Sequence, residues 1–252
     1  MTGVPNTLLG KVMLVLNAFG ADDDELGFAE LGRRTGLAKA TLHRLLGDLA
    51  DVRLLDRGTR GYRLGGHLFQ LGMRASVERR LVEVSTPYLE DLYERTHETV
   101  HLGLLEGHEV VYAAKIGGHR QASSPSRLGG RMPLHATAIG KALLAHAPVR
   151  SEVLAAPLAR RTPRTVVTPG MLRRQLATIR QTGVAYEYEE SRVGLACVAS
   201  PVLGHDGAVV AAVSVAGPTT RFDPRAHAAS VHAAATGIAL TLIRRAELTA
   251  GL

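Results

Sequence analysis

The sequence predicts an α+β protein in which a helix joins two domains. Three observations support this fold class. Residues 1–66 combine helical periodicity with one short hairpin pattern, residues 67–80 keep a helical pattern, and residues 81–252 alternate helical segments with β-branched ones. A chain of 252 residues can bury more than one hydrophobic core, and strand pairs that alternate with helices are typical of antiparallel α+β folds.

Composition limits the class of protein. Hydrophobic residues make up 46% of the chain and charged residues 21%, which is ordinary for a folded globular protein. No apolar run reaches the roughly 18 residues that a membrane helix needs, and the N-terminus lacks a signal-peptide cleavage site, so we expect a cytoplasmic protein with no membrane partner. The single cysteine, Cys197, excludes internal disulfides and an all-cysteine metal site.

The charge distribution is compatible with a polyanionic partner. The net charge is +7, and between residues 33 and 63 eight basic residues face three acidic ones. Acidic residues 22–25 lie upstream, where we expect a loop that points elsewhere. Residues 67–252 also carry 21 basic and 15 acidic residues, so charge alone does not assign the binding domain.

The N-terminal domain begins with two predicted helices. A first helix is expected over residues 1–20, where five apolar residues lie at helical spacing: Leu9, Val12, Met13, Leu16 and Phe19. The segment ADDDELG interrupts it, and a short helix follows over FAELGRRTG. Gly36 is placed to end that helix in the left-handed conformation.

A third helix over residues 38–52 and a hairpin complete a winged helix-turn-helix. The helix has one apolar stripe, formed by Leu42, Leu45, Leu46 and Leu49. Its other face is slim and cationic, which fits a DNA major groove, and RLLDRGTRGYRLG predicts a two-stranded wing that could meet phosphates or a minor groove. The candidate DNA-binding residues are Lys39, Thr41, His43, Arg44, Arg57, Arg60 and Arg63. Winged helices also serve as protein-docking modules, and this alternative stays open.

The remaining chain predicts a linker helix and a larger sheet domain. After the helical segment 67–80, a second helix is expected to begin at Thr86-Pro87, since a cap followed by proline is typical of a helix start. The segment TVHLGLLEGHEVVYAAKI predicts two strands, and LACVASPVLGHDGAVVAAVSVAG predicts a hairpin. Helices are predicted over ATAIGKALLAHA, over PGMLRRQLATIRQTG, and from Pro224 to the C-terminus.

The stretch HETVH, residues 97–101, matches the zinc-protease pattern H-E-x-x-H, which needs both histidines on one helix. Here it straddles the predicted end of a helix and the start of a strand. On a strand, His97 and His101 would lie about 13 Å apart, too far for one zinc ion. We therefore expect no metal site. Glu98 and Thr99 are expected to be ordinary junction residues, and His101 a sheet residue near the core.

Four segments resemble the IclR family of bacterial transcriptional regulators: GLAKATLHRLLGDL, RGYRLG, RMPLHATAIGKALLA and ACVASPVLGHDGAVVAAVSVAGPTTRF. The resemblance covers nearly the whole chain. It implies a winged helix-turn-helix DNA-binding domain over 1–66, a linker helix over 67–80 and a GAF-like α/β effector-binding domain over 81–252. It also implies dimers formed through the N-terminal part, which often pair into tetramers.

The chain departs from the family pattern at three positions. Ala40 and Ala216 stand where the family often has serine, and Ala196 stands where it often has arginine. Each alanine removes one potential polar contact. Ser214 remains as the hydroxyl that matches an effector-lining position.

The segment HATAIGKA is not a phosphate-binding P-loop, because His135 and Ala142 replace the glycine and the hydroxyl residue that the motif needs. A helix that starts near Thr137 would instead offer free N–H groups to a carboxylate, although Thr137 could simply cap a structural helix. The resemblance implies these effector-binding residues: Thr137, Ala138, Ile139, Glu187, Leu195, Cys197 and Ser214. For Cys197 we favour packing or pocket lining over catalysis, because no base is evident nearby.

We therefore expect a ligand-responsive regulator of a metabolic, catabolic operon that senses a small organic acid or related metabolite and needs no cofactor. It would bind a palindromic operator in double-stranded DNA as a homodimer or homotetramer. Two alternatives remain open. One is a metal- or thiol-dependent enzyme that uses HETVH or Cys197, and the other is a winged-helix protein-interaction module.

Overall fold

The computed structural model describes residues 6–117 and 124–250. The chain divides into two compact units, Met1–Arg79 and Arg80–Leu252, and each unit is described by itself. None of the described helices is long and apolar enough to cross a membrane.

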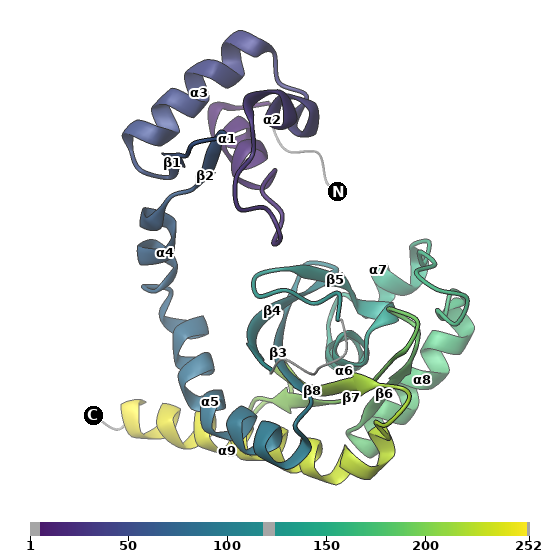
Figure 1. Ribbon diagram of the computed structural model, residues 1–252. Helices are drawn as coiled ribbons and strands as arrows, with labels where there is room; N and C mark the ends of the chain where they lie inside the picture. Colours follow the sequence, from purple (N-terminus) through teal and green to yellow (C-terminus); the bar gives the residue numbers. More distant parts are fainter. Residues whose placement is uncertain (1–5, 118–123, 251–252) are drawn as a thin grey trace. The chain divides into compact units, whose positions relative to one another are not determined.

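The N-terminal unit is a winged helix-turn-helix followed by a short helix (Figure 1). Its elements are α1 (Leu8–Leu16), α2 (Phe28–Thr35), α3 (Lys39–Asp51), β1 (Leu55–Arg57), β2 (Tyr62–Leu64) and α4 (Gly66–Gly72). Gly36 ends α2 with φ 68°, as predicted. The antiparallel wing pairs Asp56 with Arg63 and Arg57 with Tyr62. The four leucines of the predicted α3 stripe are all buried, which confirms that prediction.

The apolar stripe predicted for α1 is partly wrong. Leu9 and Met13 are 76% and 47% exposed, whereas Val15 is fully buried in the core of this unit. The segment LLGKVMLVL is apolar on nearly every side, so its periodicity alone does not determine which face packs inward.

The helical region after the wing also differs from the prediction. The segment expected to form one linker helix is divided, because α4 ends at Gly72 and α5 (Ser76–Thr96) begins after a short turn. No helix begins at Thr86-Pro87, since Pro87 lies inside α5. Tertiary packing explains why the helix continues through Pro87. Leu81 and Val84 before the proline are buried in the same core as Leu89 and Leu92 after it.

The C-terminal unit is built on a six-stranded antiparallel sheet of order β5-β4-β3-β8-β7-β6. The strands are β3 (Thr99–Glu106), β4 (Glu109–Ile116), β5 (Arg131–Pro133), β6 (Ala185–Tyr188), β7 (Leu195–Leu203) and β8 (Val209–Pro218). The other elements are η1 (Leu134–Ala136), α6 (Ala138–His146), α7 (Arg150–Ala155), α8 (Pro169–Thr182), η2 (Pro224–His227) and α9 (Ala228–Ala250). Strands β5 and β6 and helix α7 were not predicted.

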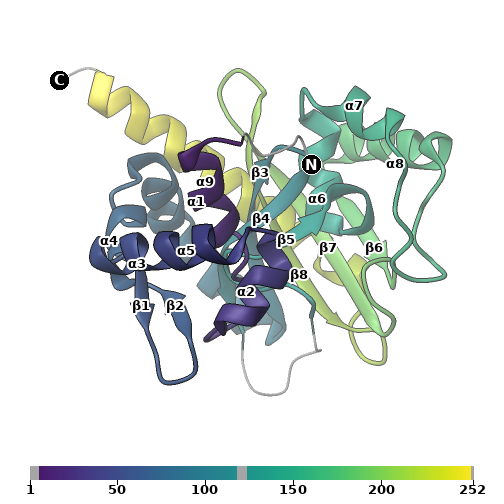
Figure 2. The ribbon, with the colours of Figure 1, turned by 90° about the horizontal axis from the view of Figure 1, so that it is seen from above.

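Helices cover both faces of this sheet (Figures 1 and 2). One core lies between the sheet and α6 and α8, and a second lies between the sheet and α5 and α9. A Cβ atom on Gly103 would lie 2.8 Å from Ile139 Cδ1, so this glycine lets α6 approach β3 closely. The predicted α+β fold class is confirmed, and the first core positions the start of α6 over the sheet.

Candidate functional site

Helix α3 presents a polar face in the N-terminal unit. Its leucines are buried, and this leaves Lys39, His43 and Arg44 exposed and Thr41 partly buried. The His43 ring lies 6.4 Å from the Phe28 ring, so its position is limited by α2. Within α3, the predicted DNA-binding residues therefore share one accessible surface.

The wing carries three exposed arginines held to different degrees. Arg60 has 80% of its side chain exposed, and its Nε lies 3.9 Å from Glu25. Arg57 lies 5.8 Å over the Tyr62 ring, and Arg63 Nε lies 3.6 Å from the Asp56 carboxylate. The charge of Arg63 is therefore partly offset by a cross-strand acid, whereas Arg57 packs on an uncharged ring.

The acidic loop expected to point elsewhere instead contacts basic residues. The Arg34 guanidinium donates to the Asp23 carboxylate at 2.5 Å, and Glu25 accepts a hydrogen bond from the Arg60 backbone N–H at 2.9 Å. Arg33 and Arg34 also bind Glu30 and lower the pKa of that carboxyl to about 2. Charge counting along the sequence missed these pairs, which neutralise part of the basic stretch.

A small cavity of about 20 Å³ lies in the C-terminal unit between the sheet and the start of α6. Six of the seven effector-binding residues expected from the family resemblance line it: Thr137, Ala138, Ile139, Leu195, Cys197 and Ser214. Six further lining residues were not predicted: His101, Tyr112, Ser124, Pro125, Met132 and Ser191. Ala216, at a position where the family often has serine, also lines the cavity. His101 lies opposite Ser214 in the sheet, so strand alternation could have found it. The loop residues Ser124 and Pro125 carry no such signal.

The start of α6 offers hydrogen-bond donors to this cavity. Thr137 caps the helix, since its Oγ1 accepts from the Gly140 N–H at 3.0 Å and donates to the Pro133 carbonyl at 3.3 Å. The backbone N–H groups of Ala138 and Ile139 have no hydrogen-bond partner among the described residues. Free N–H groups at the positive end of a helix favour an anion.

The opposite wall is a neutral hydrogen-bonded chain. His101 Nε2 lies 2.7 Å from Ser126 Oγ, which lies 2.7 Å from Ser124 Oγ. On its other side, His101 Nδ1 lies 3.4 Å from Ser214 Oγ. Burial, helped by the charge of Lys115, lowers the pKa of His101 to about 3. The imidazole is therefore neutral at physiological pH and contributes a donor and an acceptor but no charge.

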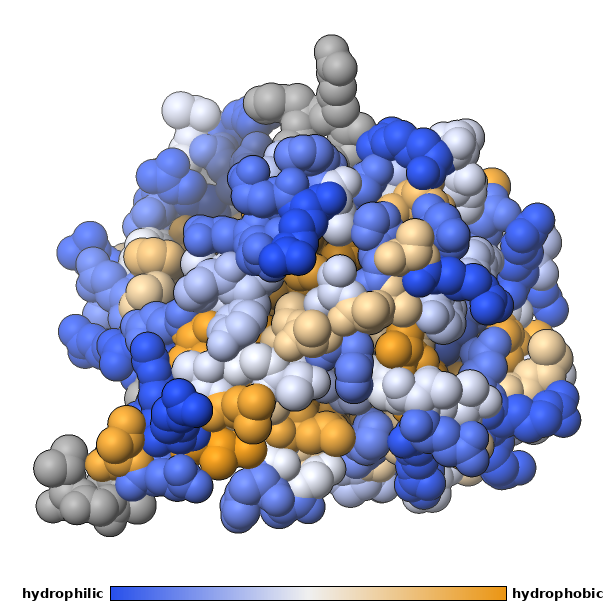
Figure 3. All heavy atoms as spheres, turned by 90° about the horizontal axis from the view of Figure 1, so that it is seen from below, coloured by the Kyte–Doolittle hydropathy of each residue, from blue (hydrophilic) through white to orange (hydrophobic). Residues whose placement is uncertain are grey.

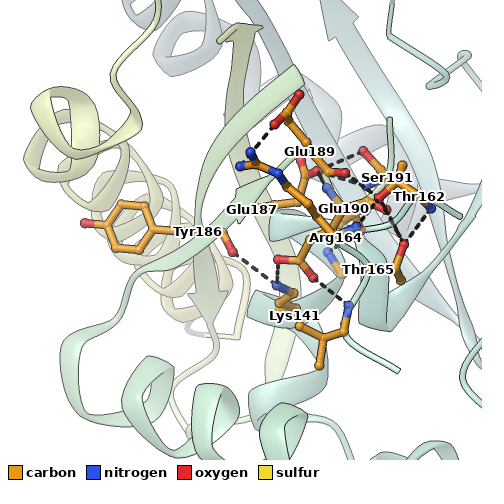
Figure 4. A network of polar contacts seen from close by, with 12 residues as sticks. Lys141, Thr162, Arg164, Thr165, Tyr186, Glu187, Glu189, Glu190 and Ser191 are labelled. Atoms are coloured by element: carbon orange, nitrogen blue, oxygen red, sulfur yellow. Dashed lines mark hydrogen bonds and ion pairs between the residues drawn. The ribbon is translucent and has the colours of Figure 1, made fainter. Parts of the chain in front are cut away.

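Glu187 does not line this cavity but lies next to it, on the strand beside Cys197. It is fully buried and pairs with Cys197 across β6 and β7. Its Oε1 accepts from the backbone N–H groups of Glu190 at 2.5 Å and Ser191 at 2.9 Å (Figure 4). Burial raises the pKa of Glu187 to about 7. Of the seven residues expected to bind the effector, Glu187 is the one that the cavity lining lacks, and it contacts the lining residue Ser191.

A polar network surrounds Glu187 on β6, the outer strand of the sheet (Figure 4). The fully buried Lys141 ammonium pairs with the Glu190 carboxylate and donates to the Tyr186 carbonyl at 3.3 Å.

Burial raises the pKa of the Cys197 thiol, and the neighbouring Glu187 adds to this effect. A thiol held protonated is a poor nucleophile, in agreement with the packing interpretation.

Comparison with known proteins identifies the family. Residues 73–240 match the model described as the bacterial transcriptional regulator IclR C-terminal domain, and residues 8–58 match the IclR helix-turn-helix domain. The chain belongs to the IclR family.

Curated relatives and solved structures of IclR regulators agree over most of the chain. The HTH-type transcriptional regulator XynR of Escherichia coli is 35% identical over 218 residues, covering 84% of this chain and 86% of the relative. KdgR of Dickeya chrysanthemi is 34% identical over 236 residues, covering 90% and 77%. The crystal structure of an IclR homolog from Microbacterium hydrocarbonoxydans, complexed with 4-hydroxybenzoate, matches with a TM-score of 0.87 at 34% identity and covers 95% of this chain and all of that one.

The IclR family consists of transcriptional regulators rather than enzymes, which removes the enzyme alternative. HETVH does span a junction, because α5 ends at Thr96 and β3 begins at Thr99. Among the described residues, no cluster of three His, Cys, Asp or Glu could hold a metal ion. Glu98 is not an ordinary junction residue, since it is buried and pairs with Arg221 at 2.8 Å. Because Arg221 lies far from Glu98 in the sequence, the residues around HETVH did not predict this ion pair.

Proposed function

We propose that this protein is a ligand-responsive, sequence-specific DNA-binding regulator of a catabolic operon, and that its effector is a small organic acid. The free N–H groups of Ala138 and Ile139 carry this proposal. They end in a cavity whose other wall is neutral, so a carboxylate would gain donors there without meeting a competing acid on the cavity surface.

Two further observations support an acid. The relative crystallised with 4-hydroxybenzoate contains a carboxylate ligand and is 34% identical to this chain. The cavity is also lined by hydrophobic residues such as Met132, Ile139 and Leu195, and at about 20 Å³ it would have to widen to admit an organic acid. A carboxylate at the α6 end and an apolar or hydroxylated remainder would fit this lining.

The experiment is a thermal-shift and calorimetric titration of the full-length protein with 4-hydroxybenzoate and with its uncharged amide. The acid should stabilise the protein by about 2.7 kcal/mol at a concentration of 100 times Kd. The amide, which lacks the negative charge, should bind at least about tenfold more weakly. A shorter series of aliphatic acids and their amides extends the test to other compact ligands.

Ala138→Pro removes one donor with little change to the helix. Proline is well accepted at the first helical position, and Thr137 already has the extended conformation, with φ −125° and ψ 145°, that precedes proline easily. Acid binding should weaken by about tenfold, since a hydrogen bond to a charged group contributes roughly 1.5 kcal/mol or more. Thr137→Ser, which keeps the cap, should bind normally. Unchanged binding by Ala138→Pro, or equal binding of acid and amide, would contradict the carboxylate proposal.

We further propose that α3 and the wing contact the operator, and that a homodimer contacts two half-sites of a palindrome. Genomic selection of fragments bound by the full-length protein would recover the operator. Lys39→Ala or Arg44→Ala should then weaken operator binding by about 1 to 3 kcal/mol if these residues contact bases. Arg60→Ala should weaken all DNA binding similarly, because a phosphate contact is independent of sequence. Recovery of no enriched sites would favour the protein-docking alternative.

The effector would act through a difference in its affinity for two conformations of the regulator. DNA binding measured with and without the acid therefore tests the coupling directly. By thermodynamic reciprocity, operator DNA should change the affinity for the acid by the same factor.

A further inference from the structure

The C-terminal unit carries an arginine-rich surface that neither candidate site uses. Between Glu152 and Glu187 the chain contains six arginines and no acidic residue. Hydrophilic side chains prevail along the edge of this unit where α8 lies (Figure 3). The α8 basic surface, as we name it, consists of five exposed arginines: Arg160, Arg161, Arg173, Arg174 and Arg192.

The loop before α8 is fixed to the connection between β6 and β7 (Figure 4). Thr162 Oγ1 donates to the Glu189 carbonyl at 2.6 Å, and Thr165 Oγ1 donates to the Glu190 carbonyl at 2.7 Å. The Arg164 guanidinium adds an ion pair with Glu189 at 3.1 Å. The loop that carries the first two surface arginines is therefore ordered against the connection that carries the fifth.

Three acidic residues of β6 and the β6–β7 connection have other partners. Glu187 is fully buried, Glu190 pairs with Lys141, and Glu189 pairs with Arg164. Across the part of the chain that the structure describes, none of the five surface arginines forms an ion pair. The surface therefore keeps five exposed positive charges on α8, on the loop before it and on the β6–β7 connection, and such an excess of one sign favours a polyanionic partner.

We propose that the α8 basic surface binds the phosphate backbone of double-stranded DNA that flanks the operator. This inference rests on the proposed function, because α3 and the wing would hold DNA at a high effective concentration for a second site on the same chain. Arginine binds phosphate through charge-assisted, often bidentate hydrogen bonds that do not depend on sequence.

The test compares full-length proteins in a salt titration with a long mixed-sequence DNA duplex. The Arg173→Ala/Arg174→Ala variant should lower the slope of log Kobs against log salt by about 1.8, because each lost phosphate contact removes about 0.9. Adding Arg160→Ala/Arg161→Ala should roughly double this change. The matched control is Arg95→Ala/Arg131→Ala, which removes the same charge from exposed, ion-paired arginines of the same unit. Its slope should stay at the wild-type value.

The outcomes separate this inference from the proposed function. If Lys39→Ala/Arg44→Ala weakens binding and Arg173→Ala/Arg174→Ala leaves the slope unchanged, the surface does not bind DNA and the proposed function stands. If Arg173→Ala/Arg174→Ala keeps the wild-type slope but no longer binds an acidic protein that the wild type binds, the surface binds that protein instead of DNA. If the wild-type protein binds no DNA, both proposals fail. Circular dichroism and melting temperature verify that each variant is folded.

Discussion

The carboxyl group of Glu187 couples the stability of the C-terminal unit to pH. One oxygen is bonded to backbone N–H groups, and the other has no hydrogen-bond partner of good geometry among the described residues. A neutral carboxylic acid is therefore less costly to bury here than a carboxylate.

The pH dependence follows from the raised pKa of Glu187. Below the ordinary value of 4.5 the group is protonated in both states, and between 4.5 and about 7 only the folded state keeps the proton. Stability is therefore lost as pH rises through this window, by at most on the order of 3 kcal/mol. Glu187→Gln should remove this loss, which chemical denaturation at about pH 5 and about pH 8 would measure.

The comparison with Glu187→Gln also controls for His101. The lowered pKa of His101 destabilises the folded state as pH falls below 6.5, which is the opposite trend. Both proteins contain this histidine, so its effect cancels when the two curves are subtracted. Parallel curves would mean that Glu187 is ionised in the folded protein.

Cys197 should be chemically inert in the native protein. It is buried, and its pKa is raised by that burial and by Glu187. A thiol-specific reagent should react about as slowly as global unfolding allows, and rapidly after denaturant is added. Cys197→Ser should keep the response to the acid. Rapid labelling of native protein with loss of DNA binding would instead indicate a redox switch.

At the scale of elements, α5 stays helical through a proline because its other residues pack in the core. Pro87 is exposed and lies within the helix, where it cannot donate a backbone hydrogen bond. Proline in a helix interior costs about 3 kcal/mol relative to alanine. Pro87→Ala should therefore raise the melting temperature of the C-terminal unit, with a gain of roughly 1 to 3 kcal/mol. A lower melting temperature would mean that the helix needs a bend at this position.

The sequence predicts long elements better than short ones. Strands β3, β4, β7 and β8 have eight or more residues, which is enough for alternation to be visible. Strands β5 and β6 have three and four residues, too few to show a period. The start of α5 was misplaced because Thr86-Pro87 is a local signal, whereas burial of Leu81 and Val84 is a tertiary one.

The candidate site shows the same limit. The positions from Thr137 to Ile139 follow from a family resemblance, and the helix cap supports them. Ser124 became part of the cavity only through tertiary folding of a loop, and no periodicity predicts that. Glu187 was expected to contact the effector, yet it pairs with Cys197 on the neighbouring strand and does not line the cavity. Sequence patterns identify residue types and strands, but not which side chains border a cavity.

At the scale of the whole molecule, exposed apolar residues on the N-terminal unit suit the homodimer that the family resemblance implies. Leu9 and Phe69 are 76% and 72% exposed, and the C-terminal unit also exposes Leu240 and Leu248 on α9, where hydrophobic side chains gather (Figure 3). Leu9→Glu/Phe69→Glu should shift the protein from dimer to monomer in light scattering coupled to size-exclusion chromatography. Leu128→Glu, a control at another exposed leucine, should leave the mass unchanged.

The dimer prediction also has a consequence for DNA. Separate monomers would contact one half-site each, so Leu9→Glu/Phe69→Glu should lose most of the preference for a palindrome over a single half-site. An unchanged mass for this variant would place the subunit interface elsewhere.

The buried Lys141 also bears on whether the outer strand of the sheet can pair with another molecule. Strand β6 is an outer strand, and its backbone polar groups on the open side could pair with a strand from another molecule. The Lys141 ammonium occupies the Tyr186 carbonyl on that strand while Glu190 balances its charge. Loss of this one cation would leave the Tyr186 carbonyl without this donor and the Glu190 carboxylate without its counterion. Aggregation through strand addition would then threaten the protein even where its cores remain intact.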